Sequence, residues 1–154
     1  MAGVFSKMNL RDQTEILVLN APESFEPEIA SLAGVRVVRS ISKVKAVSFA
    51  LAFATRQTEV DTIAAELCSK ADGDALLWFA YPKGTSKKYK CDFHRDTGWR
   101  VLGEHGFESV RMVAIDEDWS ALRFRDQRFV KTMNRAPKNA LSAEGKRRAA
   151  KSGA

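Results

Sequence analysis

Three short segments of the sequence consist almost wholly of apolar residues, and they constrain the fold more than any other feature. They are residues 16–19 (ILVL), 46–54 (AVSFALAFA) and 75–81 (ALLWFAY). A strand with water on one face alternates apolar and polar residues, whereas a strand covered on both faces is apolar throughout. These segments therefore predict the central strands of a sheet that has helices on both faces.

Helical patterns separate these strands. Residues 24–32 carry apolar side chains at helical spacing, and Gly34 ends the segment. A second helix is predicted to begin near Thr58, where Asp61 three residues later completes a variant of the capping box, and residues 71–74 break it. Its apolar residues follow the spacing of one helical face and are Val60, Ile63, Ala64 and Leu67.

The remaining elements complete an α/β order. A third helix is predicted over residues 92–104, with Asp92 as its N-cap and Gly106 in the left-handed conformation after its end. Further strands are predicted at residues 35–38, 110–115 and 119–124, of which the last two pair antiparallel across a short turn. This order predicts a Rossmann-like fold, a mostly parallel and doubly wound sheet of about six strands with an antiparallel strand near one end.

One connection leaves the direction of the second strand open. Only seven residues separate Val38 from Ala46, which is too few for a crossover helix. Those residues could run back extended along the sheet, which would make residues 35–38 a parallel strand. Otherwise, residues 35–38 form an antiparallel neighbour.

The charge of the chain is concentrated at its C-terminus. The 154 residues carry a formal net charge of +6. Residues 131–154 hold seven basic residues and one acidic residue, so residues 1–130 are neutral. Apolar periodicity also ends near Val130, which predicts a single domain over residues 1–130 and a basic, disordered tail over residues 131–154.

The sequence also indicates a compartment. The first residues show no signal peptide, and no apolar stretch is long enough to span a membrane, so we expect a cytoplasmic protein with no membrane partner. Two cysteines are too few for a disulfide framework. Cys91 and His94 have a spacing that zinc ligands use, but no second pair accompanies them, so we expect no metal site.

Four motifs resemble a family of short bacterial proteins that is catalogued as a domain of unknown function. The resemblance covers about residues 10–126 and rests on Val18–Pro22, on Tyr81-Pro82-Lys83, on Asp92 with Arg95-Asp96 and Trp99, and on Asp116 with Asp118–Arg125. That family is similar to a shortened class I methyltransferase, and residues 73–78 fall where such enzymes have a glycine-containing turn. The resemblance implies the strand order second, first, third, fourth, sixth, fifth, with the sixth antiparallel.

The sequence departs from methyltransferases at both positions that define a nucleotide-type cofactor site. Such a site needs glycines after the first strand and an acidic residue at the end of the second, where it binds ribose hydroxyls. Here the first turn is Asn20–Phe25, with a proline, an acidic residue and no glycine, and the second strand is followed by Arg39. The cofactor is therefore unknown, with S-adenosylmethionine as the candidate that the resemblance implies.

In an open α/β sheet, ligands bind at the carboxyl ends of the strands near the switch in strand order. The polar groups expected at that edge, together with one aromatic residue that could stack on a planar ligand, form the candidate ligand site of an unknown small molecule. They are Asn20, Arg56, Tyr81, Lys83, Asp92, Arg95, Asp96 and Trp119.

Each of these residues also has a structural interpretation. Lys83 could simply solvate a lysine-rich loop, and Asp92 could act only as a helix cap. Arg95 and Asp96 could form a salt-bridge cluster that fixes the loop to the helix, and Trp119 could belong to the core.

Three functional hypotheses follow. The first is a binding or regulatory module that resembles a degenerate methyltransferase, and the second is an enzyme with an altered S-adenosylmethionine or nucleotide site. The third is a nucleic-acid accessory protein that binds weakly and without sequence specificity through residues 131–154. The same segment could instead be a solubilising extension.

Overall fold

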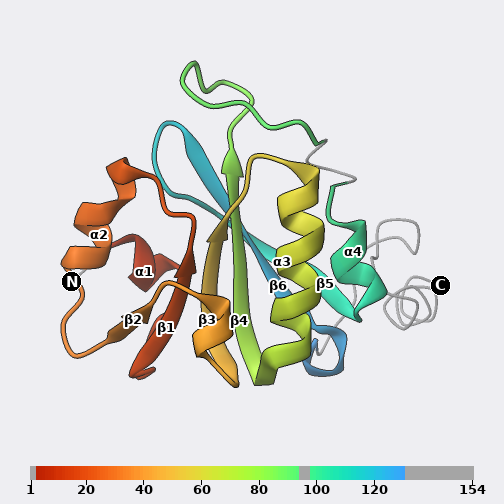
Figure 1. The fold of residues 1–154 in the computed structure, drawn as a ribbon. Coiled ribbons are helices and arrows are strands. Elements are labelled where there is room, and N and C mark those ends of the chain that lie inside the picture. Colours follow the sequence, from red (N-terminus) through yellow and green to blue (C-terminus); the bar gives the residue numbers. More distant parts are fainter. Residues whose placement is uncertain (1–2, 94–97, 131–154) are drawn as a thin grey trace.

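The computed structural model describes residues 3–93 and 98–130, which form one six-stranded sheet with helices on both faces (Figure 1). The strands lie in the order β2-β1-β3-β4-β6-β5. Their bounds are β1 Glu15–Leu19, β2 Arg36–Val38, β3 Val47–Phe53, β4 Ala71–Pro82, β5 Phe107–Ala114 and β6 Trp119–Asp126. The predicted fold class and the strand order implied by the resemblance are both confirmed.

The strands β2, β1, β3 and β4 pair in parallel, and β6 runs antiparallel to both β4 and β5. The second strand, β2, is therefore parallel to β1, which confirms the parallel alternative of the two that the sequence left open. The connection that follows it is not fully extended, because it contains a 3₁₀ turn at Ile41–Lys43. Lys70, the last residue of the helix α3 (Gln57–Lys70), donates from Nζ to the carbonyl oxygens of Ile41 at 2.7 Å and Val44 at 2.9 Å. These bonds tie the connection to the C-terminal end of α3.

The helices form two layers (Figure 1). On one face, α1 (Val4–Lys7), a 3₁₀ turn (Glu23–Phe25) and α2 (Glu26–Ala30) bury apolar side chains against the sheet. On the other face, α3 and α4 (Arg100–Glu104) do the same. Each face therefore has its own hydrophobic core.

The central strand β4 lies between these two cores. Its residues 77–80 have 0% of their surface exposed, and their side chains alternate between the two faces. On the α1 face, the Trp78 indole donates from Nε1 to the carbonyl oxygen of Met8 at 3.1 Å. On the α3 face, Phe79 packs against Trp99 with ring centroids 5.7 Å apart. This double burial explains why residues 75–81 of β4 form an unbroken apolar run.

The start of α3 differs from the prediction. The helix begins at Gln57, and the residue that caps it is Glu59, whose Oε1 accepts from the backbone N–H groups of Thr55 at 3.0 Å and Arg56 at 3.1 Å. The predicted capping box of Thr58 with Asp61 is wrong, because Asp61 accepts from the Gln57 side chain instead. The capping box is formed by Arg56 and Glu59, two positions before the predicted pair.

The third predicted helix is also shorter than expected. Helix α4 covers only Arg100–Glu104, and Asp92 does not cap it. The Asp92 carboxylate instead accepts from the backbone N–H of Gln57 at 2.6 Å, so it caps α3 from 35 positions along the chain. Residues 71–74, predicted as a break, belong to β4. Gly106 does follow α4 with a φ of 83°, in the left-handed region that was predicted for it.

Two expectations concern other parts of the chain. The basic tail over residues 131–154 lies outside the described residues. Within residues 3–93 and 98–130, none of the helices has the length and apolar character needed to cross a bilayer.

A pair of substitutions tests the capping of α3. We expect Glu59→Ala to lower the free energy of unfolding by about 1 kcal/mol, because two backbone N–H groups lose their acceptor. Asp61→Ala is the matched control and should cost less than about 0.5 kcal/mol, since it removes one exposed side-chain contact. Urea unfolding monitored by tryptophan fluorescence measures both. Equal losses in the two variants would contradict the capping role of Glu59.

Candidate functional site

The carboxyl ends of β1, β3 and β4 meet at one edge of the sheet, and the long loop after β4 rises from that edge (Figure 1). A cavity of about 410 Å³ lies at the end of β4 and in this loop. Its apolar side is formed by Tyr81, Tyr89 and Phe93, and its cationic side by Lys83 and Lys90. We call it the β4 cavity.

The loop that forms the β4 cavity is held by a network centred on Ser86. The Ser86 hydroxyl is buried and donates to Asp118 Oδ1 at 2.9 Å, while it accepts from the N–H of Tyr89 at 3.0 Å. The N–H of Lys83 donates to the Asp118 carbonyl oxygen at 2.8 Å. Asp118 lies in the turn between β5 and β6, so this turn and the β4 loop are fixed to one another. The cavity therefore has a defined wall rather than a loose lysine-rich loop.

The eight predicted site residues separate into four groups of two. Tyr81 and Lys83 line the β4 cavity, with Tyr81 95% buried and Lys83 half-buried. Asp92 and Arg56 lie at the start of α3, where the Asp92 carboxylate and the Arg56 backbone take part in capping. Arg95 and Asp96 lie outside the described residues.

The last two predicted residues lie on the α1 side of the edge. Asn20 follows β1 with a φ of 58°, and its Nδ2 donates to the carbonyl oxygen of Phe53 at 3.4 Å. Trp119 is buried and packs against Phe53 and Tyr89, with ring centroids 5.1 and 4.9 Å away. Its Nε1 is buried and makes no hydrogen bond to any described residue. Because Tyr89 also lines the β4 cavity, Trp119 supports that wall from behind.

The place of a nucleotide-type cofactor is occupied by other interactions. The turn after β1 brings Pro22, which has no N–H, and the carboxylate of Glu23 to the start of a three-residue 3₁₀ turn. After β2, Arg39 donates from Nη1 and Nη2 to the two carboxylate oxygens of Glu26 in α2, each at 2.9 Å. These hydrogen bonds lower the pKa of Glu26 and raise the pKa of Arg39. The residues present therefore do not fit a dinucleotide or S-adenosylmethionine site at these two positions.

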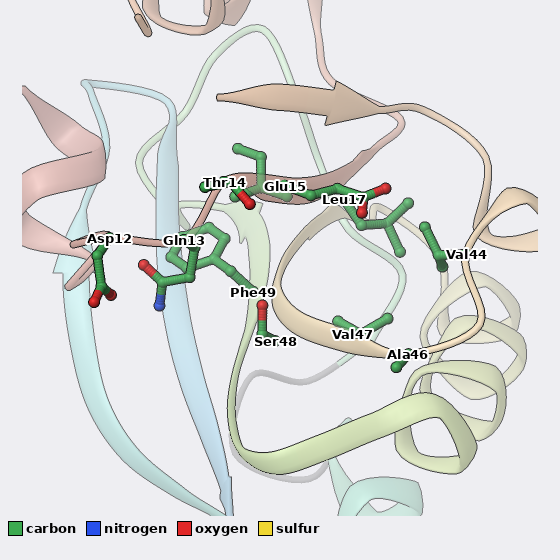
Figure 2. A pocket seen from close by; sticks show the side chains of 11 residues that line it. Asp12, Gln13, Thr14, Glu15, Leu17, Val44, Ala46, Val47, Ser48 and Phe49 are labelled. Carbon is green, nitrogen blue, oxygen red and sulfur yellow. The ribbon is translucent and has the colours of Figure 1, made fainter. Parts of the chain in front are cut away.

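A second cavity opens at the opposite edge of the sheet. It has a volume of about 310 Å³ and lies between the segment around Asp12–Glu15 and the start of β3, as Figure 2 shows. It exists because the pairing of β1 with β3 begins only at Leu17 and Ala50, so the two strands separate before that point. The apolar runs of the sequence did not indicate this gap, although the polar residues Glu15 of β1 and Ser48 of β3 both line it.

Sequence reasoning missed four residues that the β4 cavity uses, namely Ser86, Tyr89, Lys90 and Phe93. The first three lie in a segment without helical or strand periodicity, which is typical of a solvated loop, and Phe93 fell within the predicted helix over residues 92–104. The available signal was the aromatic Tyr89 within a run of lysines. An aromatic ring among cations is more typical of a binding surface than of a plain solvated loop.

Comparisons with known proteins identify the fold. No protein-family model matches the sequence, and no curated protein matches it. Among solved structures, the chain is similar to a SAM-dependent methyltransferase from Aquifex aeolicus, with a TM-score of 0.53 and 14% identity over 80% of this chain and 87% of the other. It is also similar to the N-methyltransferase NodS from Bradyrhizobium japonicum WM9, with a TM-score of 0.51 and 12% identity over 80% and 92% of the two chains.

A third similar structure was determined with a cofactor product. It is the magnesium protoporphyrin IX methyltransferase ChlM from Synechocystis with bound SAH, with a TM-score of 0.50 and 11% identity over 79% and 78% of the two chains. At such low identities the likeness concerns the fold alone. The chain has a methyltransferase-like fold. Its resemblance to the family of unknown function stays a prediction.

The β4 cavity can be tested with a fluorescent aromatic anion. We expect 1-anilinonaphthalene-8-sulfonate to bind there, because its rings can contact Tyr81 and Tyr89 while its sulfonate meets Lys83 and Lys90. The double variant Lys83→Gln with Lys90→Gln should bind it about fivefold more weakly, since two partly exposed ion pairs contribute about 1 kcal/mol. Fluorescence titration gives the dissociation constants.

The matched control for this titration is Lys45→Gln with Lys87→Gln, which removes two exposed lysines that do not line the cavity. We expect it to bind the dye as the unmodified chain does. If both double variants weakened binding equally, the effect would reflect net charge and the β4 cavity would not be the site.

Proposed function

We propose that this chain is a binding module on a methyltransferase-like fold, whose ligand occupies the β4 cavity and which does not transfer methyl groups. The observation that carries the proposal is the ion pair of Arg39 with Glu26 after β2. In nucleotide-binding folds of this architecture, an acidic residue at that position accepts hydrogen bonds from the ribose hydroxyls. A guanidinium cannot accept a hydrogen bond, so it cannot replace that residue.

The Glu26 carboxylate does not restore the missing acceptor. Both of its oxygens already accept from Arg39. The pair is bidentate, and this geometry fixes both side chains more firmly than a single contact. Ribose binding would therefore require the pair to open.

The turn after β1 supports the same conclusion. A cofactor site there relies on glycines that let the backbone approach the ligand and on N–H groups that face it. In this chain the turn has Ala21 and Pro22 in place of glycines, and Glu23 brings a negative charge next to the position of the cofactor. The 3₁₀ turn then buries Phe25 against Phe53, with ring centroids 5.0 Å apart. Through Phe25, this turn therefore packs against the core.

The chemistry of the β4 cavity indicates the class of ligand. Its lining combines aromatic rings with the ammonium groups of Lys83 and Lys90, and none of the lining residues within 3–93 and 98–130 is acidic. Such a lining favours a small molecule with an apolar or planar part and a negatively charged group. The general rule for open α/β sheets also places ligands at this edge.

A second candidate function is an enzyme with an altered S-adenosylmethionine or nucleotide site. The likeness in fold to SAM-dependent methyltransferases, one of them with bound SAH, favours it. It requires a binding mode that uses neither a glycine turn after β1 nor an acidic residue after β2. The two candidates therefore differ in one measurable property, the affinity for the cofactor.

Thermal unfolding separates the two candidates. We expect S-adenosylmethionine and S-adenosylhomocysteine at about 1 mM to leave the melting temperature unchanged. A ligand with a dissociation constant of about 10 µM would stabilise the chain by about 2.7 kcal/mol at that concentration, or several degrees. A methyltransferase known to bind the cofactor serves as the positive control on the same plate. A saturable rise in melting temperature of this chain would contradict the binding-module proposal and favour the second candidate.

A further inference from the structure

Two arginines lie directly opposite each other on neighbouring strands. Arg111 of β5 and Arg123 of β6 are partners in the antiparallel register, so their side chains leave the same face of the sheet. That face is the one that carries Trp78, Ala121 and the α1 core, because Arg123 follows Ala121 by two positions and is the register partner of Trp78. Like charges that face each other across two strands are destabilising. The pairing therefore needs an explanation.

Arg123 is the unusual member of this pair. It is half-buried, and its Nε is fully buried without a hydrogen-bond partner among the residues that the structure describes. Burial is the main cause that lowers the pKa of its guanidinium, and the positive charges of Arg125 and Arg111 lower it further, while the negative charge of Asp74 opposes them only in part. A partly buried guanidinium with an unsatisfied N–H costs stability, because it has lost water without gaining an acceptor.

The acidic residues near the pair are already engaged elsewhere. Asp74 accepts from Arg125, with 2.8 Å between Nε and Oδ1, and this bidentate contact uses both of its oxygens. Glu108 is fully buried and faces Arg125 rather than Arg123 in the register of β5 with β6. Arg111 is exposed and forms no ion pair within residues 3–93 and 98–130. The two guanidiniums therefore present several unused donors side by side.

We propose that Arg111 and Arg123 form a phosphate-binding site for the backbone of a nucleic acid. A guanidinium has a planar fork of donors that matches two oxygens of a phosphate, and two forks on neighbouring strands can hold one or two phosphates. A bound phosphate would accept from the terminal Nη groups of the half-buried Arg123 and the exposed Arg111, and its negative charge would remove the repulsion between the two arginines. It thus accounts for an arrangement that is unfavourable in the free protein.

The charge of the sequence after Val130 favours a nucleic acid over a small phosphate. Val130, the last described residue, packs against Val110, the residue before Arg111. The following residues 131–154 carry seven basic residues and one acidic residue. The described part of the chain therefore ends against a sequence neighbour of Arg111, and the sequence continues with further positive charge, which suits an extended polyanion. The motif that contains Arg123 and Arg125 was singled out in the sequence, and the β4 cavity does not use it.

Salt dependence of binding tests this site in the full chain. The probe is a fluorescein-labelled DNA duplex of about 20 base pairs, and anisotropy gives its affinity at several NaCl concentrations. Each neutralised phosphate adds about 0.9 to the slope of log affinity against log salt. Arg111→Gln with Arg123→Gln should therefore reduce the slope by about 1.8. Between about 50 and about 200 mM NaCl, the unmodified chain should lose about twelvefold more affinity than this variant.

The matched control is Arg36→Gln with Arg100→Gln, which removes two exposed arginines from β2 and α4. We expect it to keep the slope of the unmodified chain. An unchanged slope in the Arg111 and Arg123 variant would overturn the proposal, and so would an equal reduction in both double variants. Because Arg123 has no hydrogen-bond partner to lose among the described residues, the first variant should unfold in urea at least as late as the unmodified chain. A loss of its folded state would contradict the assignment of Arg123 as an unsatisfied group.

A second probe distinguishes the partner. A glutamate-rich peptide with the same net charge as the duplex should bind more weakly, because its flexible backbone does not hold the carboxylates at the regular spacing of the phosphates in a duplex. If the peptide bound as tightly as the duplex, with the same dependence on Arg111 and Arg123, the site would serve an acidic protein segment and the nucleic-acid proposal would be wrong.

Discussion

The structure depends on the burial of β4 on both faces. Residues 77–80 are inaccessible to water, and β4 is the strand at which parallel pairing with β3 gives way to antiparallel pairing with β6. Both hydrophobic cores contact it, one through Trp78 and the other through Phe79. Every polar group of functional interest is therefore displaced to the end of this strand or to the outer strands. The β4 cavity lies at that end, and the pair of Arg111 and Arg123 lies on the outer strands.

The fold of this chain resembles that of methyltransferases, but the residues at two positions differ from those of a nucleotide site. The sheet order and the helical layers match those of methyltransferases, yet the two positions at which such folds hold a nucleotide are used for internal contacts. Phe25 fills the core below the turn after β1, and Arg39 ties β2 to α2 through Glu26. Those contacts stabilise the domain directly. Because that edge is used for packing, we propose that function depends on other side chains of the fold.

The sequence predicted the sheet well because double burial leaves a local signal. The runs in β1, β3 and β4 carry apolar residues on both faces of the strand, so they could be recognised as buried strands without knowing which strands they pair with. The start of α3 could not be read in this way, because Asp92 caps it from 35 positions away and Glu59 reaches back to Thr55. In the candidate site, Tyr81 and Lys83 could be predicted because they lie at the end of an apolar strand. Ser86 and Tyr89 did not, since their roles depend on contact with Asp118 and Trp119.

The central claim is that the ends of β1 and β2 no longer form a cofactor site. The most direct measurement is a titration of ¹⁵N-labelled protein with S-adenosylhomocysteine, followed by the amide signals of residues 20–26 and of Arg39. The account predicts that these signals do not move, because the turn after β1 is packed and Arg39 is paired with Glu26. A saturable shift confined to these amides would contradict it and place the cofactor where methyltransferases hold it.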